Sequence, residues 1–301
     1  VLFRMNFLAV CLCFAMNRPY QFYYFVPLVS FWYAVLYVTL AIPPQITAAS
    51  TEQNPLHYFY MVIKLVVLIA LSTMLYMSEV FFERIFVTRP WKALFVSTDD
   101  DIHEWWFRWK LDRYSITFGM IFGYLYQLAQ RYRLIDDSNH GNLWLRSVSL
   151  LVTLAGVAGL GGYLAFSFLC VTKERCNEVH SYLVFAPILS YVFLRNVSGY
   201  LRTRYSPFFV WFGKISLELF VMQYHIFLAA DTSGILVLIP SYPVLNMLVV
   251  TFIFVCAAHE VHAITTILTP YAVPQDWRAM LRNIVVFICI LIPIGIHDGM
   301  F

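Results

Sequence analysis

Long apolar runs separated by short polar stretches make up most of the chain. Three of these runs carry no charge at all, Pro19–Thr51, Ser147–Thr172 and Thr232–Ala258. Each exceeds the ~20 residues that a helix needs to cross ~30 Å of hydrocarbon. The strict alternation typical of membrane β-barrels is absent. The pattern therefore predicts an all-α protein, a polytopic helical bundle integral to a membrane.

The polar stretches divide these runs into candidate helices. Pro43 and Pro44, for example, end one run, because proline disrupts a helix interior. We expect one multispan membrane domain over residues 1–301, with roughly eight to ten spans. The predicted helices are Leu2–Met16, Tyr20–Ile42, His57–Met77, Ser115–Gln130, Ser147–Cys170, Ser181–Leu194, Pro207–Ala230, Ile235–Ala258 and Met280–Ile296.

The stretch from residue 79 to residue 114 differs from the rest, with clustered charges and tryptophans. It predicts a loop or an interfacial amphipathic segment. The loops around Arg131–Arg146 and Arg195–Arg204 are both basic, which favours the cytosol for both under the positive-inside rule. The 79–114 stretch is equally basic. Either it folds back into the membrane or the span count differs by one, so its sidedness stays open.

Composition supports the membrane class and narrows the partners. Hydrophobic residues make up 61% of the chain and charged residues 12%, about half the charged share of a soluble domain. The net charge of +3 is spread over loops, so no basic face for nucleic acid is expected. The cysteines show neither metal-ligand spacing nor a disulfide framework, which predicts apolar packing. They are Cys11, Cys13, Cys170, Cys176, Cys256 and Cys289.

The stretch Trp211–Asp231 carries ionisable residues inside an apolar helix. At 100° per residue, Lys214, Glu218 and His225 fall within about 40° of one another and form one polar stripe. Such groups are costly in hydrocarbon and normally face a bundle interior or a watery cavity. His225 could act as a general base or carry an acyl group. The alternative is a packing histidine beside a Lys214–Glu218 pair at the membrane edge.

Two other histidine motifs have simpler interpretations. His259, Glu260 and His262 follow the Ile235–Ala258 span, but their spacing is not that of the HExxH zinc motif. We expect a juxtamembrane polar cap and no metal site. Asp100 and His103 have the spacing of the Asp-x-x-His block of SGNH-type esterases, but no Gly-Asp-Ser block accompanies them.

Cations interleaved with aromatic residues suggest an anionic ligand. Arg108, Lys110 and Arg113 alternate with tryptophans, a combination that suits nucleotide phosphates such as those of coenzyme A. Lipid phosphates at the interface are the alternative. Arg18 and Tyr20 open a predicted helix and could bind a sugar or phosphate, or anchor the helix at the interface.

Several longer blocks resemble one known family. The blocks are MNRPYQFYYFVPLVSFWY (Met16–Tyr33), FVTRPWKALF (Phe86–Phe95), DDDIHEWWFRWKLDRYS (Asp99–Ser115), GKISLELFVMQYHIFLAADT (Gly213–Thr232) and FVCAAHEVH (Phe254–His262). They are similar to the multispan O-acetyltransferase domain shared by animal sialic-acid O-acetyltransferases, fungal capsule-acetylation proteins and plant wall-polysaccharide acetylation proteins. The animal branch is the most similar of the three.

The resemblance implies a function and a compartment. It implies a multi-pass Golgi membrane enzyme that takes acetyl from cytosolic acetyl-CoA and acetylates sialic acid or CMP-sialic acid in the lumen. His225 is then the expected catalytic residue, with Glu218 tuning it. The expected acetyl-CoA ligands are Arg108, Lys110, Arg113, Arg18, Tyr20 and Lys214.

The same resemblance implies a missing part. Animal members also carry upstream spans and a lumenal SGNH-type domain, whereas this chain begins at Val1 with an apolar run. We therefore expect a fragment, with the final transfer to sugar possible in either part. Two other functions remain open, a transporter that moves acetyl-CoA or another anion without chemistry, and a scaffold for a lumenal enzyme.

Overall fold

The computed structural model describes residues 2–16, 23–86, 103–135, 141–229 and 234–297. Within these ranges the chain is helical apart from turns, loops and one isolated bridge between Leu228 and Ile235. The predicted all-α class is confirmed.

Membrane-spanning length is reached by several helices. Within the described ranges, α4 (Leu56–Tyr76), α9 (Arg146–Leu169) and α14 (Pro243–Ala272) are long and apolar enough to cross a membrane. Apolar stretches of 10–17 residues occur in Leu2–Cys13, Phe25–Ala41 and Phe185–Val197. The apolar pattern of the sequence thus corresponds to helices of a polytopic membrane protein.

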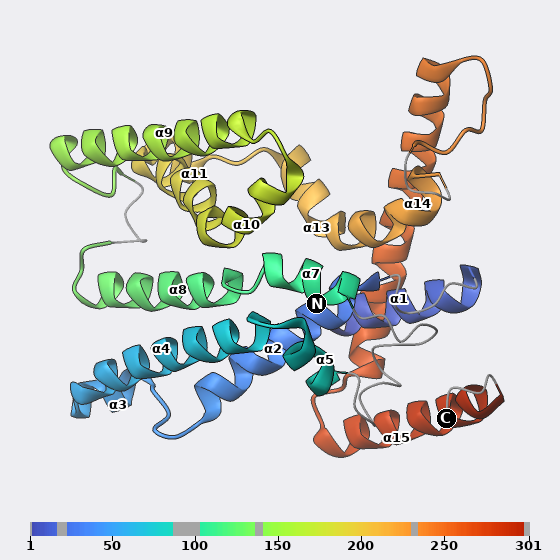
Figure 1. Ribbon diagram of the computed structural model, residues 1–301, viewed down its shortest axis with the longest axis horizontal. Coiled ribbons are helices and arrows are strands. Elements are labelled where there is room, and N and C mark those ends of the chain that lie inside the picture. Colours follow the sequence, from blue (N-terminus) through green and yellow to red (C-terminus); the bar gives the residue numbers. More distant parts are fainter. Residues whose placement is uncertain (1, 17–22, 87–102, 136–140, 230–233, 298–301) are drawn as a thin grey trace. The chain divides into compact units, whose positions relative to one another are not determined.

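The helices fall into two compact units (Figure 1). The described parts of Val1–Ser30 and Ser206–Phe301 form the first unit, and those of Phe31–Thr88 and Asp100–Tyr205 form the second. Helix α2 (Phe25–Ala41) begins in the first unit and continues in the second.

The first unit is built on α1 (Leu2–Met16), α13 (Pro207–Met222) and α14, which pack against one another. Pro207 and Pro243 occupy the first turns of α13 and α14, where the missing N–H has no helical acceptor to lose. Helix α15 (Trp277–His297) follows α14. The predicted helix Ile235–Ala258 is wrong at both ends, because Pro243 sets the start and no breaker follows Ala258 until Pro270.

A π-helical turn follows α13 directly. The predicted helix Pro207–Ala230 ends at Met222, and η2 (Gln223–Phe227) widens the last turn. The chain is then extended, and the side chain of the buried Asn246 of α14 holds the backbone of residues 236–239 by hydrogen bonds. Its Oδ1 accepts from the Leu238 and Ile239 amides at 2.7 and 3.0 Å, and its Nδ2 donates to the Leu236 carbonyl at 2.9 Å.

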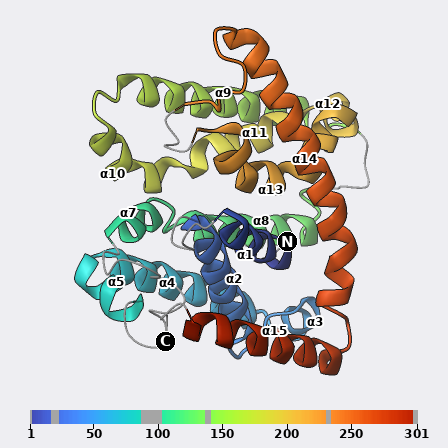
Figure 2. The ribbon, with the colours of Figure 1, turned by 90° about the vertical axis from the view of Figure 1, so that its right-hand side faces the viewer.

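The second unit contains the remaining helices, several of them short. Helices α9 and α11 lie side by side (Figure 2). An added Cβ at Gly156 or Gly159 would approach Leu194 Cγ to 2.8 Å or Ser190 Oγ to 2.4 Å. These two glycines therefore let the helices approach closely. The helices are α3 (Ala48–Gln53), α4, α5 (Glu79–Phe86), α7 (His103–Leu111), α8 (Ser115–Arg131), α9, α10 (Lys173–Leu183), α11 (Phe185–Val197) and α12 (Gly199–Thr203).

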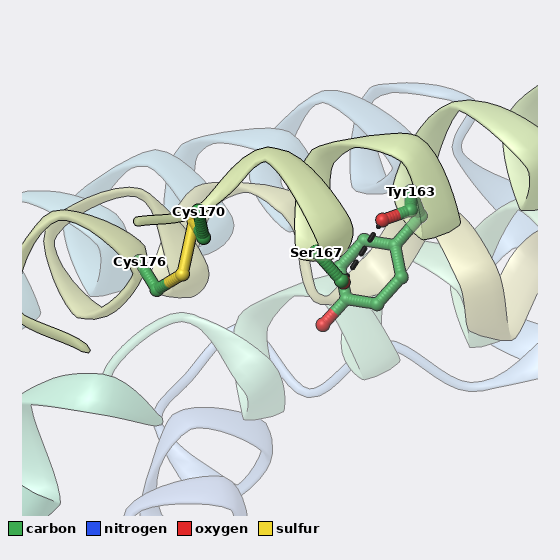
Figure 3. Close-up of a disulfide and its surroundings, with 4 residues drawn as sticks. All are labelled: Tyr163, Ser167, Cys170 and Cys176. Carbon is green, nitrogen blue, oxygen red and sulfur yellow. Dashed lines mark hydrogen bonds between the residues drawn. A yellow bond between two sulfur atoms is a disulfide. The ribbon is translucent and has the colours of Figure 1, made fainter. Parts of the chain in front are cut away.

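Two of the six cysteines are joined, contrary to the prediction from the sequence. Cys170 forms a disulfide with Cys176, with the Cα atoms 5.8 Å apart (Figure 3). Helix α9 ends at Leu169, and the chain turns at once into α10. That reversal brings the first turn of α10 back to the end of α9, which sequence spacing alone does not indicate. Cys11, Cys13, Cys256 and Cys289 are free thiols.

Candidate active site

Glu218 on α13 has no exposed surface. Its Oε1 accepts hydrogen bonds from Arg4 Nε at 3.2 Å and from Thr265 Oγ1 at 3.3 Å. Arg4 Nη2 donates to the same oxygen, and His262 Nδ1 lies 3.4 Å from Oε2. We call Arg4, Glu218, His262 and Thr265 the Glu218 cluster. A buried carboxylate is costly unless it is paired and hydrogen-bonded, and this cluster satisfies both conditions.

The residues of the Glu218 cluster come from three helices that are mostly apolar. Arg4 is the one charged residue of α1, Glu218 comes from α13, and His262 and Thr265 come from α14. Beside the cluster, Ala9 and Ala258 are fully buried within a core of larger apolar side chains. Small residues at a helix contact let backbones approach. The packing of these helices therefore brings the four polar side chains together.

His262 can exchange partners within the cluster. Its Nδ1 lies 2.6 Å from Arg4 Nη2 and 3.4 Å from Glu218 Oε2. A guanidinium only donates, so bonding to Arg4 requires a free lone pair on Nδ1. With a proton on Nδ1, His262 instead donates to Glu218. The cluster thus provides a partner for either ring tautomer.

His225 belongs to a second polar contact in the same unit. It lies in η2, and its Nε2 is hydrogen-bonded to the hydroxyl of Tyr23, a residue with no exposed surface. The two ring centroids are 5.7 Å apart. Tyr23 also belongs to the apolar core formed by α1, α2, α13 and α14. π-Turns inside helices are frequent at functional sites.

The predicted polar stripe is distributed over three environments. Lys214 is exposed on α13, Glu218 is buried in its cluster, and His225 lies beyond the end of α13. In the described part of the chain, Glu218 pairs with Arg4 and His262, not with Lys214. The alternative of a Lys214–Glu218 pair at the membrane edge is therefore wrong.

A cleft opens beside the Glu218 cluster. Its volume is about 430 Å³, and Arg4 is the charged side chain in its wall. The other lining residues come from the end of α14 and the turn after it, Thr266, Thr269, Pro270, Val273, Pro274 and Gln275. Pro270 has no N–H to donate to the carbonyl of Thr266, four residues earlier. The cleft therefore presents polar groups next to an otherwise buried charge network.

The cations of α7 and the turn after it have different surroundings. Arg108 is exposed, whereas Lys110 Nζ lies 4.7 Å from the ring centroid of Trp106. Arg113 is buried against Tyr114 and Tyr182, and its Nη2 donates to the Tyr182 hydroxyl at 2.8 Å.

Asp112 lies next to these cations. Burial raises the pKa of its carboxyl, while nearby His180 and a hydrogen bond from Ser115 act in the opposite direction. Arg113 thus belongs to the packed interior of the unit, whereas Arg108 is exposed and Lys110 and Asp112 are half-buried.

Some predicted residues lie outside the described ranges. Arg18, Tyr20 and Asp100 are among them, so their surroundings are not described. In the ranges that are described, no group of three or more His, Cys, Asp or Glu side chains is placed to hold a metal ion. His259 and Glu260 lie within α14 rather than in a cap after it.

The arrangement so far is a helical membrane protein with a buried Arg–Glu–His network. Residues 1–285 match the family described as the 10 TM Acyl Transferase domain found in Cas1p. The chain belongs to this family. Its membership confirms the resemblance drawn from the sequence blocks, and the family description agrees with a polytopic helical bundle.

A curated relative gives a finer comparison. The chain is 44% identical over 301 residues to the N-acetylneuraminate (7)9-O-acetyltransferase of Danio rerio. The match covers 99% of this chain and 38% of that protein, so the chain spans well under half the length of its relative. No solved structure matches the chain.

Sequence reasoning missed three members of the cluster, Arg4, His262 and Thr265. A signal for Arg4 exists in the sequence, because a lone arginine in the apolar run of α1 is the kind of intramembrane charge that indicates function. The prediction of a polar cap for His262 is wrong, because it rests on a helix that ends at Ala258. The helix in fact continues to Ala272, and that continuation turns His262 toward Glu218.

Proposed function

We propose that this domain catalyses the membrane step of sialic-acid O-acetylation, taking acetyl from acetyl-CoA on the cytosolic side of the Golgi membrane. The observation that carries the proposal is the buried Arg4–Glu218–His262 network in a member of a membrane acyltransferase family. The name of the Danio rerio relative supports N-acetylneuraminate as the acceptor, and we include its CMP conjugate in the proposal.

The chemistry requires a base and a place for the departing thiolate. The nucleophile attacks the thioester carbonyl, the C–S bond breaks, and coenzyme A leaves as a thiolate that takes up a proton. If the nucleophile is a hydroxyl, the new bond is an ester and its proton passes to a base. A histidine suits this task because its pKa lies near neutrality.

His225 is the histidine that we assign to this step. Its Nε2 is engaged by the Tyr23 hydroxyl, which orients the ring and can pass a proton to or from it. It acts either as the base for the nucleophile or as the nucleophile that carries acetyl to a second site. A lumenal SGNH-type domain in the remainder of the protein would then complete the transfer.

Glu218 acts through its neighbours. Since Arg4, Thr265 and His262 occupy its oxygens, the carboxylate is a positioning group that holds Arg4 at the wall of the cleft and His262 beside it. Arg4 is the charged side chain that a substrate in the cleft would meet.

The donor's phosphates need cations that face the cytosol. Arg108, Lys110 and Arg113 have the right chemistry, as have Arg18, Tyr20 and Lys214. The assignment of the first three requires that α7 lies on the cytosolic side of the membrane. The buried position of Arg113 leaves Arg108 and Lys110 as the accessible pair of this group.

The rate at which the purified full-length protein releases coenzyme A from acetyl-CoA tests the proposal. With acetyl-CoA and acceptor present, we expect His225→Ala to lower the release rate by roughly 10²- to 10⁴-fold, the usual contribution of a general base. His259→Ala is the matched control, because His259 is an exposed histidine of α14 whose ring lies beside that of Trp211. It should retain the parental rate.

The variants also separate the two histidine centres. Equal rates for His225→Ala and the parent, with loss in His262→Ala, would move the catalytic role to the Glu218 cluster. Equal rates for all three variants and the parent would reject acyl transfer in this domain.

A further inference from the structure

The disulfide marks one end of the second unit. Cys170 follows the last residue of α9, and Cys176 lies in the first turn of α10 (Figure 3). Disulfides form and persist in secretory compartments and outside the cell, and are rare in the reducing cytosol. The end of α9 that carries this bond therefore belongs on the oxidising side of the membrane.

Other elements are tied to this disulfide end. Helix α10 packs against α7, and Arg113 Nη2 donates to Tyr182 of α10 at 2.8 Å. The last turns of α4 meet the start of α8 there, since Thr73 Oγ1 lies 2.9 Å from the Tyr114 hydroxyl. Helix α5 joins them through a hydrogen bond of 2.9 Å between Glu79 and His103.

The opposite ends of the same helices also meet one another. Arg131, in the last turn of α8, donates to Thr51 at 2.8 Å. The Asn142 side chain, just before α9, accepts from the Gly199 amide after α11 at 2.8 Å. Arg204 places its guanidinium 4.2 Å from the Tyr200 ring centroid. We call this the arginine end. Its arginines are Arg131, Arg133, Arg146, Arg195, Arg202 and Arg204.

Helices α9 and α11 connect the disulfide end to the arginine end of the second unit. Helix α9 starts at Arg146 and ends next to Cys170, and α11 starts after α10 and ends at Val197, close to Arg202. Arginines in short loops at helix ends favour the cytosol. The disulfide therefore assigns the oxidising side to one end of these helices, and this leaves the arginine end on the cytosolic side, where the positive-inside rule favours arginines.

We infer that the second unit crosses the membrane with the Cys170–Cys176 bond formed in an oxidising lumen and with its arginine end in the cytosol. This orientation decides the side of α7, which charge counting left open because both ends carry cations. Arg108, Lys110 and Arg113 then face the lumen with the disulfide.

The orientation changes the ligand expected at α7. A cytosolic phosphate-bearing donor does not reach Arg108 and Lys110, whereas an anionic sugar acceptor in the lumen does. A cation beside the face of Trp106 suits a sugar that carries a carboxylate. This ligand assignment rests on the proposed function, but the orientation does not.

Labelling of single introduced cysteines tests the orientation in sealed vesicles whose cytosolic face is outside. The full-length protein would carry either Tyr205→Cys, an exposed site at the arginine end, or Glu178→Cys, an exposed site on α10. We expect a membrane-impermeant maleimide to label position 205 fully before detergent is added and position 178 only afterwards. The unsubstituted protein gives the background of its native thiols.

The thiol state is measured on the same material. After free thiols are blocked, Cys170 and Cys176 should react with a second reagent only once the sample has been reduced, and Cys170→Ser should abolish that signal. Labelling of both introduced sites from one side, the reverse order of labelling, or free thiols at Cys170 and Cys176 would overturn the inference. None of these readouts depends on enzymatic activity, so an inactive protein would leave the inference intact.

The ligand assignment has its own readout. Lys110→Gln should raise the KM for the sialic-acid acceptor and leave the KM for acetyl-CoA unchanged. A raised KM for acetyl-CoA alone would overturn this assignment while leaving the labelling result untouched.

Discussion

At the scale of single residues, Glu218 has a closely constrained environment. It is fully buried, and the Arg4 guanidinium pairs with it. Removing one partner of a buried ion pair leaves the other charge without compensation. We therefore expect Glu218→Ala to lower the free energy of unfolding by about 3–5 kcal/mol, measured by thermal melting of the purified protein in detergent.

A neighbouring residue provides the control for that measurement. Lys214 lies one turn earlier on α13 but is exposed. Lys214→Ala should change stability by no more than about 0.5 kcal/mol, as expected for a surface substitution. Equal melting temperatures for the Glu218 and Lys214 variants would contradict the buried network.

The Tyr23 hydroxyl offers a sharper test of His225. Tyr23→Phe keeps the ring in the apolar core but removes the hydrogen bond to Nε2. Because a misoriented catalytic group can cost on the order of 10²-fold, we expect kcat for coenzyme A release to fall by that order. The KM and the melting temperature should change little.

Tyr24→Phe is the matched control, since Tyr24 contacts the Phe25 ring and has no assigned role in the transfer. A loss in Tyr23→Phe that appears entirely in KM would indicate a substrate contact instead of ring orientation.

Helical spacing predicted part of the site and could not predict the rest. It identified Glu218 and His225 as polar residues in an apolar helix, which the structure places inside the first unit. It assumed a regular helix, whereas the π-turn after Met222 changes the phase before His225. Arg4 and His262 are more than 40 positions from Glu218, so only tertiary packing reveals them as partners.

At the scale of elements, apolar runs predicted the helices better than their ends. Leu2–Met16 is found as predicted, and α4 differs from its prediction by one residue at each end. Larger errors occur where backbone chemistry overrides hydrophobicity, as at Pro243. The disulfide is a further example, because it depends on the reversal between α9 and α10.

The contact between α9 and α11 gives a prediction at this scale. An added Cβ at Gly156 would approach Leu194 Cγ to 2.8 Å, whereas one at Gly162 would meet nothing within 4 Å. Gly156→Val should therefore lower the free energy of unfolding by about 1–3 kcal/mol through overpacking, measured by thermal melting. Gly162→Val carries the same change in helix propensity without the contact. Equal destabilisation by the two variants would mean that propensity, rather than packing, explains the loss.

For the whole molecule, composition and apolar pattern sufficed to predict a polytopic helical protein, but not its direction in the membrane. The orientation of the second unit in the membrane can be inferred only once contacts between elements far apart in the sequence are known. Examples are the contact of Thr51 with Arg131 and the packing of α7 against α10. It matters for function because the proposed donor and acceptor lie on opposite sides. An enzyme of this kind must move an acetyl group, and not the whole donor, across the bilayer.

This requirement distinguishes the proposed transferase from a transporter of acetyl-CoA. Sealed vesicles containing the full-length protein and lumenal acceptor would receive acetyl-CoA outside, with different labels on the acetyl group and on the nucleotide. Because the C–S bond breaks before the acetyl group reaches the lumen, we expect only the acetyl label inside, and its transfer to be lost in His225→Ala. The His259→Ala control should behave as the parent. Both labels inside at equal amounts, unchanged in His225→Ala, would show that the intact donor crosses and that any transfer chemistry lies elsewhere in the protein.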